Sequence, residues 1–128
     1  MSDYVGGYGC SSAKLVVVGE APGGHEVEQG LPFVGPAGVI LNEALISAGL
    51  DRSELYITNV VKVRPPGNDI RSLHLIGKEI SDFLPQLWEE LEAINPNCIL
   101  AVGGTALEAL IGYQGIEKYR GSILRCQK

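Results

Sequence analysis

Three runs of apolar residues most strongly constrain how this chain of 128 residues folds. The runs lie at 14–20, 54–63 and 97–104. They are continuous or rich in β-branched residues, which is typical of strands buried on both faces of a parallel sheet. Segments with helical periodicity follow the runs, at 35–50, 72–94 and 105–112. This β-α-β-α-β-α order predicts an α/β fold, a three-layer α/β/α sandwich with a central parallel sheet.

The remaining segments are less regular. Residues 1–13 are small and glycine-rich and predict an irregular arm, and residues 21–34 predict a rigid loop. Pro85 either kinks the segment 72–94 or begins a second helix within it. Residues 119–128 begin what reads as a further strand.

Length, charge and cysteine content narrow the class of protein. A chain of 128 residues suggests one domain. Its net charge of −5 argues against a broad nucleic-acid surface, because phosphate contacts need Lys and Arg. Cys10, Cys98 and Cys126 are odd in number and lack C-x-x-C spacing, so neither a disulfide framework nor a zinc site is indicated. Without a signal peptide or a membrane-length apolar run, we expect a soluble protein of the cytoplasm.

Residues of chemical interest follow each predicted strand. Glu20 ends the first run, Asn59 ends the segment "LYITN" of the second, and Gly103 and Gly104 end the third. Ligands of open parallel sheets bind beyond the carboxyl ends of the strands. We therefore expect these residues to share one edge.

Two glutamates in the first loop allow several roles. Glu20 could activate water, bind a metal ion or cap the next turn. Glu26 could share a water molecule with Glu20 and shift its pKa, or it could be an ordinary solvated charge.

An aromatic and an amide are the next candidates. Phe33, held between Pro32 and Pro36, is either a core residue or a stacking platform for a planar ligand. Asn59 either closes a turn or reads the amide edge of a ligand, because a buried amide without partners costs roughly 1–3 kcal/mol.

Two further segments suit phosphate. Lys62 and Arg64 in "KVRPPGN" form either a phosphate-contacting loop or a solvated turn. Gly103 and Gly104 in "VGGTAL" precede a helix, which is a generic anion site. The segment is not a Walker loop, which would need G-x-x-x-x-G-K-[ST].

Taken together, these motifs resemble the uracil-DNA glycosylase superfamily, in particular its family 4 branch. "GEAPGGHEVEQGLPFVGPAG" is similar to the first motif of that branch, GEAPG-x-x-E followed by G-x-PFVG-x-AG. "YITNVVKVRPPGN" resembles its ITNVVKCRPP segment, and "NPNCILAVGGTALEAL" resembles its third strand and glycine turn. The resemblance runs from about Val5 to Gly121.

The resemblance implies roles for five residues. A flipped uracil would stack on Phe33, and the amide of Asn59 would donate to uracil O4 and accept from N3–H. Glu20 would position or activate the water that attacks C1′, and Glu26 would support that water or the loop. The backbone from Ala21 would line the site.

The chain departs from the family 4 pattern at its cysteines. That branch ligates an iron–sulfur cluster with four cysteines. Val63 stands where the second motif carries one of them, and the place of another falls near Phe83. The N-terminal C-x-x-C is also absent. We therefore expect no metal and no iron–sulfur cluster, because such clusters are held by thiolates.

A second departure concerns the C-terminal end. The family carries a late His-Pro-Ser-type motif, whose His hydrogen-bonds uracil O2 and whose loop inserts into the duplex. The chain ends at Lys128, before such a motif. We expect residues 1–128 to form a single glycosylase-like domain that is C-terminally incomplete. The family sheet has about four strands, and the last of them is expected to be incomplete or missing here.

The resemblance implies hydrolysis of the N-glycosidic bond of uracil in DNA, by a monomer that does not bind membranes. The alternative is a module of the same fold that binds a base, nucleotide or nucleic-acid end without cleaving it. The missing late motif and the acidic charge favour this alternative. The joint presence of Glu20, Glu26, Phe33 and Asn59 disfavours it. An enzyme acting on another deaminated base is a third hypothesis.

Overall fold

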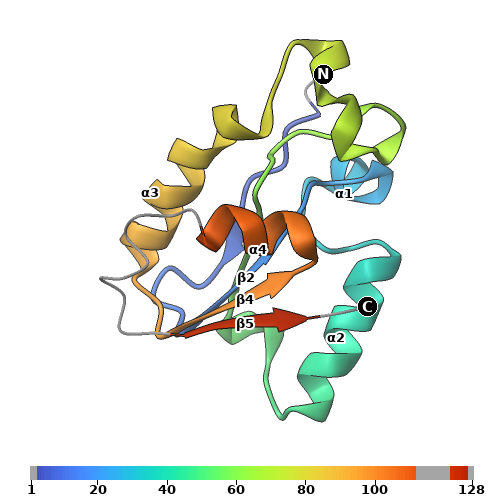
Figure 1. Ribbon diagram of the computed structural model, residues 1–128. Helices are drawn as coiled ribbons and strands as arrows, with labels where there is room; N and C mark the ends of the chain where they lie inside the picture. The colour runs from blue at the N-terminus through green and yellow to red at the C-terminus, as the bar shows by residue number, and fades with distance from the viewer. Residues whose placement is uncertain (1–2, 112–121, 127–128) are drawn as a thin grey trace.

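The computed structural model describes residues 3–111 with their side chains and residues 122–126 by their backbone. These residues form a five-stranded sheet with the order β1-β3-β2-β4-β5 (Figure 1). The strands are β1 Tyr8–Gly9, β2 Leu15–Gly19, β3 Tyr56–Asn59, β4 Cys98–Val102 and β5 Ser122–Cys126.

Strand β2 lies at the centre of the sheet and is parallel to both of its neighbours. The register places Val17 opposite Ile57 of β3 and opposite Leu100 of β4. Val16, Val17 and Val18 are each 0% exposed, so this strand is buried on both faces. The parallel centre of the sheet predicted from the apolar runs is therefore confirmed.

Both ends of the chain add strands to this centre. The arm, expected to be irregular, contains β1, which runs antiparallel to β3 with Tyr8 opposite Ile57. At the other edge β5 is parallel to β4 from Ser122 to Cys126. The sheet is therefore mixed rather than purely parallel, and its last parallel strand is present rather than missing.

Helices cover both faces of the sheet (Figure 1). Helix α2, Pro36–Ser47, packs its Leu41 and Leu45 with Val17 of β2. Helices α3, Leu84–Ile94, and α4, Gly104–Ile111, pack in a second cluster with the alternate β2 residues Val16 and Val18. Successive strand residues thus face different helices, as the period of two requires, and the three-layer arrangement is confirmed.

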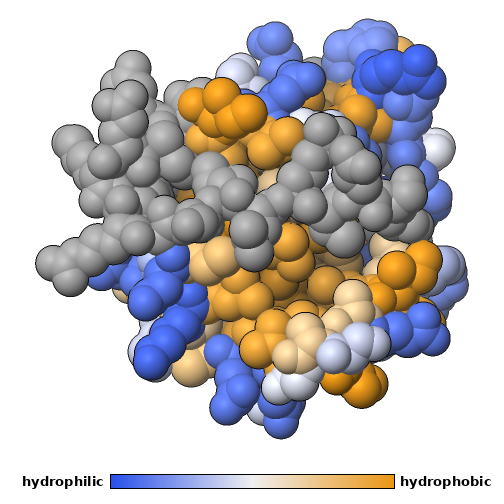
Figure 2. All heavy atoms as spheres, turned by 60° about the horizontal axis from the view of Figure 1, so that its bottom comes forward, coloured by the Kyte–Doolittle hydropathy of each residue, from blue (hydrophilic) through white to orange (hydrophobic). Residues whose placement is uncertain are grey.

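The α2 side of the molecule exposes apolar surface. Figure 2 shows apolar side chains gathered on the side that faces down in Figure 1. An apolar cavity of about 180 Å³ lies between α2 and the sheet, and Leu15, Leu41 and Leu100 are among its lining residues. Val39 and Ile46 of α2 are also exposed. The α2 side therefore carries exposed apolar side chains next to an apolar cavity.

Several short helices differ from the sequence predictions. Helix α1, Gly24–Gln29, lies within the segment expected to be a loop. The segment expected to be helical from residue 72 contains two 3-10 helices before α3, and Pro85 lies in the first turn of α3. Of the two roles considered for Pro85, it therefore begins a helix, where its missing N–H is not needed. The 3-10 helices are η1 Arg52–Glu54, η2 Pro66–Asn68, η3 Ile70–Ile76 and η4 Ile80–Phe83.

Within the described part of the chain, every helix is too short or too polar to cross a bilayer.

Candidate active site

The connections that follow the parallel strands meet at one edge of the sheet. Gly19, the last residue of β2, is the register partner of Asn59, the last residue of β3. Gly103 follows β4, and Gly104 begins α4. The residues that the sequence placed at a common edge therefore lie there.

Glu20, which follows β2, is joined by a hydrogen bond to helix α4. The Oγ1 of Thr105, in the first turn of α4, donates to Glu20 Oε2 at 2.7 Å. Within residues 3–111 no other hydrogen bond or ion pair engages this side chain, so Glu20 does not cap its own turn. The bond fixes one carboxylate oxygen against the helix and leaves Oε1 without a partner among residues 3–111.

Glu26 binds the main chain of the loop through both of its carboxylate oxygens. One of its oxygens accepts from the N–H of Gly23 at 2.9 Å. The other accepts from the N–H groups of Val34, at 3.0 Å, and Gly35, at 2.8 Å. Burial alone would raise the pKa of Glu26, but these N–H groups outweigh it and hold the pKa below its usual value. Of the two roles that the resemblance implied for Glu26, support of a water molecule or support of the loop, these bonds agree with the second, and they contradict an ordinary solvated charge. A catalytic part for Glu26 stays a prediction.

Phe33 adopts a strained backbone conformation just before the two residues, Val34 and Gly35, whose N–H groups bind Glu26. Its φ is 55°, a left-handed value that is rare for a bulky residue, and its side chain is 8% exposed. The carbonyl of Pro32 before it accepts from Arg52 Nη2 at 2.7 Å. The N–H of Val34 after it is bound by Glu26. Charged side chains therefore hold the peptides on both sides of Phe33, which offsets the strain.

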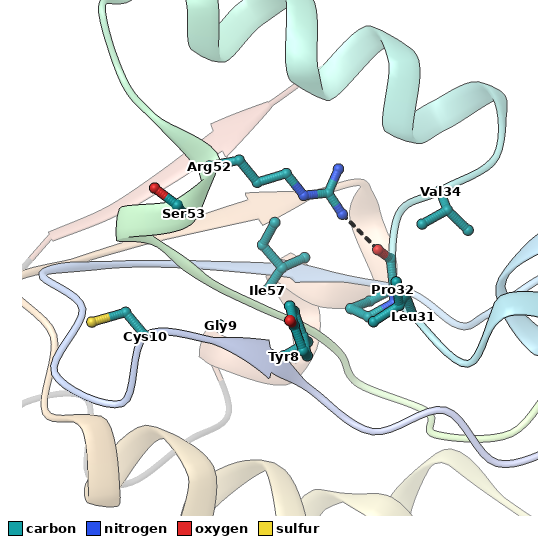
Figure 3. A pocket seen from close by; sticks show the side chains of 9 residues that line it. All are labelled: Tyr8, Gly9, Cys10, Leu31, Pro32, Val34, Arg52, Ser53 and Ile57. Carbon is teal, nitrogen blue, oxygen red and sulfur yellow. Dashed lines mark hydrogen bonds between the residues drawn. The ribbon is translucent and has the colours of Figure 1, made fainter.

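Arg52 was not predicted, because it lies in η1, distant in sequence from the loop. Figure 3 shows its guanidinium reaching from η1 to the Pro32 carbonyl. It lies beside a cavity of about 550 Å³ that Tyr8 and Ile57 also line. The lining of this cavity includes none of the residues predicted to form the site.

Gly19 is a second residue that the sequence prediction missed. A Cβ atom there would overlap Cζ of Phe33 and would lie 2.6 Å from Oδ1 of Asn59. The aromatic ring and the amide therefore both lie against the bare backbone of Gly19. A glycine at a strand end is a known signal of close approach, and it could have identified this position.

The side-chain amide of Asn59 is buried without a partner. Asn59 is 4% exposed, and no hydrogen bond to its amide exists among the described residues. An amide that only closed a turn would bond to the turn. Buried polar groups are almost always paired, so an unpaired amide beside an aromatic ring points to a ligand.

Lys62 does not face solvent. It is 0% exposed, and its Nζ lies 2.7 Å from Glu90 Oε1. The prediction that Lys62 contacts phosphate is therefore wrong, because an ammonium in the interior of the protein cannot reach a DNA backbone.

The other predicted phosphate contacts lie at the surface. The Nε of Arg64 donates to Asn68 Oδ1 at 2.8 Å, and its guanidinium lies beside Gly24, the first residue of α1. Gly103 and Gly104 are exposed, with open space where a Cβ would stand. These three remain predicted contacts.

Ala21 is half-buried, and its side chain packs against the cluster under α3 and α4. That the Ala21 backbone lines the site stays a prediction.

The positions of the expected cluster cysteines do not suit an iron–sulfur cluster. Val63 and Phe83 both pack against the apolar cluster under α3 and α4. The residues with described side chains contain no group of three or more His, Cys, Asp or Glu that could hold a metal ion, and Cys10 and Cys98 are free thiols. The side chains at these two positions therefore cannot ligate an iron–sulfur cluster.

Comparison with known proteins places these observations in one family. The model of the Uracil DNA glycosylase superfamily matches residues 7–126. The Type-4 uracil-DNA glycosylase of Archaeoglobus fulgidus is 43% identical over 99% of this chain and 64% of its own length. The Type-4 uracil-DNA glycosylase of Pyrobaculum aerophilum is 40% identical over 87% of this chain and 55% of its own length. The Type-4 uracil-DNA glycosylase of Thermotoga maritima is 39% identical over 94% of this chain and 62% of its own length. The chain therefore spans less than two thirds of each relative.

We predict that Glu26→Gln lowers the free energy of unfolding at neutral pH by about 1–3 kcal/mol. The Gln amide offers one oxygen, and its NH₂ would face a backbone N–H. Because folding lowers the pKa of Glu26, the carboxylate stabilises fully above its ordinary pKa of about 4.3. This contribution disappears as the pH falls through the lower, folded-state value. Urea unfolding across the acid range measures the difference from wild type.

The matched control is Glu28→Gln, which changes an exposed acid of the same helix. It should change stability little at any pH. A Glu26→Gln effect that does not shrink in acid would contradict the stabilising role of the bonds between the Glu26 carboxylate and the loop.

We predict that purified protein contains no stoichiometric iron. Val63 and Phe83 supply no thiolate, and thiolates hold such clusters. The measurement is iron and acid-labile sulfide per chain after anaerobic purification and after incubation with ferrous iron and sulfide. A stable cluster in either sample would mean that other ligands hold it.

Proposed function

Because the chain belongs to the uracil-DNA glycosylase superfamily, we propose that it hydrolyses the N-glycosidic bond of uracil in DNA. The proposal rests mainly on Asn59, whose buried amide lacks a partner among the described residues and lies with the Phe33 ring against Gly19. An aromatic face beside an unpaired amide is the pair of groups that a flipped pyrimidine requires. Residues 1–128 would belong to one glycosylase domain, acting as a monomer in the cytoplasm.

In this proposal Asn59 and Phe33 recognise the base. Uracil presents O4 as an acceptor and N3–H as a donor, and one orientation of the Asn59 amide satisfies both. Phe33 stacks on the ring. Its strained backbone, held from Arg52 and Glu26, supports a fixed platform, because a clamped loop needs little reorganisation when the base enters.

Glu20 is the proposed catalytic carboxylate. Its carboxylate would hold the attacking water with Oε1 and stabilise the oxocarbenium-like sugar, while the Thr105 hydroxyl fixes Oε2. The backbone from Ala21 would line the site. Departing uracil carries negative charge, and hydrogen-bond donors at the pocket stabilise it. Arg64, Gly103 and Gly104 would contact phosphates at the same edge.

We predict that the protein releases uracil from a labelled oligonucleotide, detected as alkali-sensitive abasic sites. No His-Pro-Ser run occurs in the 128 residues, and losing one donor to a developing anion costs about 10²–10³ in rate. The assay therefore uses enzyme in excess of DNA over long times. Glu20→Gln should abolish release, and Glu28→Gln should not. Tight binding of the oligonucleotide without release would instead support the binding module.

A second prediction concerns Asn59→Asp. The carboxylate has no donor for uracil O4, so two oxygens meet in a desolvated pocket, whereas it can accept from the cytosine N4 amine. Each unpaired buried group costs roughly 1–3 kcal/mol, so uracil release should fall at least about tenfold and discrimination against cytosine should weaken. Single-turnover rates on both bases measure this, with thermal unfolding to confirm that the variant folds. Unchanged rates on both bases would remove Asn59 from the site.

A further inference from the structure

A buried ion pair joins the end of β3 to helix α3. Lys62 is 0% exposed, and its Nζ lies 2.7 Å from Oε1 of Glu90, which is 13% exposed. Glu90 also accepts from the hydroxyl of Tyr56, at 2.7 Å, and from Oγ1 of Thr58, at 3.0 Å. One carboxylate therefore binds three side chains of a single segment, 56–62.

The same ammonium also bonds to the main chain. Lys62 Nζ donates to the carbonyl oxygen of Asn59. The N–H of Val60, on the other side of that peptide bond, donates to Gly19 O at 2.8 Å. The peptide plane between Asn59 and Val60 is therefore fixed at both its oxygen and its nitrogen. Because that plane sets ψ of Asn59, it also limits the direction of the amide side chain.

Stability alone does not explain the pair. Burial lowers the pKa of the Lys62 ammonium, and the Glu90 carboxylate opposes part of that lowering. Replacing a buried ion pair with apolar residues of similar size is often neutral or stabilising. A role in fixing one geometry is the alternative explanation for such a pair.

The N-terminal arm covers this network. A Cβ atom on Gly7 would overlap the Tyr56 hydroxyl and Glu90 Oε2, so the arm approaches both as bare backbone. The N–H of Val5 donates to Lys62 O at 2.6 Å. Burial and the Glu90 carboxylate raise the pKa of Tyr56, which keeps its hydroxyl a donor. The arm thus shields most of the pair from solvent, and only Glu90 is partly exposed.

We propose that Lys62 is a positioning residue, which aims the Asn59 amide at the base by fixing the Asn59–Val60 peptide. Glu90 in turn holds Lys62. This inference rests on the proposed function for its catalytic consequence, but the fixation of the peptide does not depend on that function. Lys62 itself touches no substrate.

The test separates positioning from stability. Lys62→Met leaves Glu90 buried without its counterion and should lower the midpoint of thermal unfolding strongly. Lys62→Met combined with Glu90→Gln removes both charges and keeps acceptors for Tyr56 and Thr58. The double variant should recover most of the midpoint. Positioning should not recover, because no donor reaches the Asn59 carbonyl.

Amide hydrogen exchange measures the geometry without catalysis. In the double variant the Val60 N–H should exchange at least tenfold faster, and the side-chain NH₂ resonances of Asn59 should shift, while the Ile57 N–H keeps its protection. Thr58→Val is the matched control, since it removes another partner of Glu90 but leaves Lys62 on the Asn59 carbonyl. It should leave the Val60 exchange rate unchanged.

Kinetics provide the second readout. In the double variant kcat for uracil release should fall at least tenfold with KM for the oligonucleotide nearly unchanged, because phosphate contacts dominate DNA affinity. Its preference for uracil over cytosine should fall in parallel. If the wild type releases no uracil, the proposed function fails, and hydrogen exchange alone decides the positioning role. Wild-type Val60 exchange in a stable double variant would overturn the inference, as would wild-type kcat and base preference.

Discussion

The parallel pairing of β2 with both of its neighbours is the constraint on which the site depends. It fixes Gly19 opposite Asn59 and sends the chain after β4 to the same edge. Parallel strands end together, so three connections far apart in sequence must meet there. The acid after β2, the amide ending β3 and the hydroxyl beginning α4 come together because of this register.

Charged side chains hold the two proposed base-binding residues by their main chains. Arg52 and Glu26 bind the peptides that flank Phe33, and Lys62 binds the carbonyl of Asn59. Glu26 and Lys62 were both considered as functional residues from sequence, Lys62 for a different reason, whereas Arg52 was not considered. Charged side chains of this fold thus bind and fix the main chain inside the protein.

The sequence predicted what depends on local pattern. The apolar runs identified the parallel strands, and the motifs at their ends identified the edge, because periodicity reports burial directly. It could not predict the burial of Lys62, since that depends on Glu90 of a distant helix. It also missed α1, because this helix has no buried apolar side chains and is stabilised by the cap from Glu26. It predicted one helical segment at 72–94, where 3-10 helices precede Pro85. Each miss involves a tertiary contact or a cap.

Gly19 has a consequence for how this chain can change over evolutionary time. Its bare backbone is in contact with both the Phe33 ring and the Asn59 amide, which belong to separate segments. Any larger residue requires the Phe33 ring and the Asn59 amide both to move. A substitution at Gly19 therefore disturbs two proposed base-binding residues at once, so this position links the divergence of one segment to that of the other.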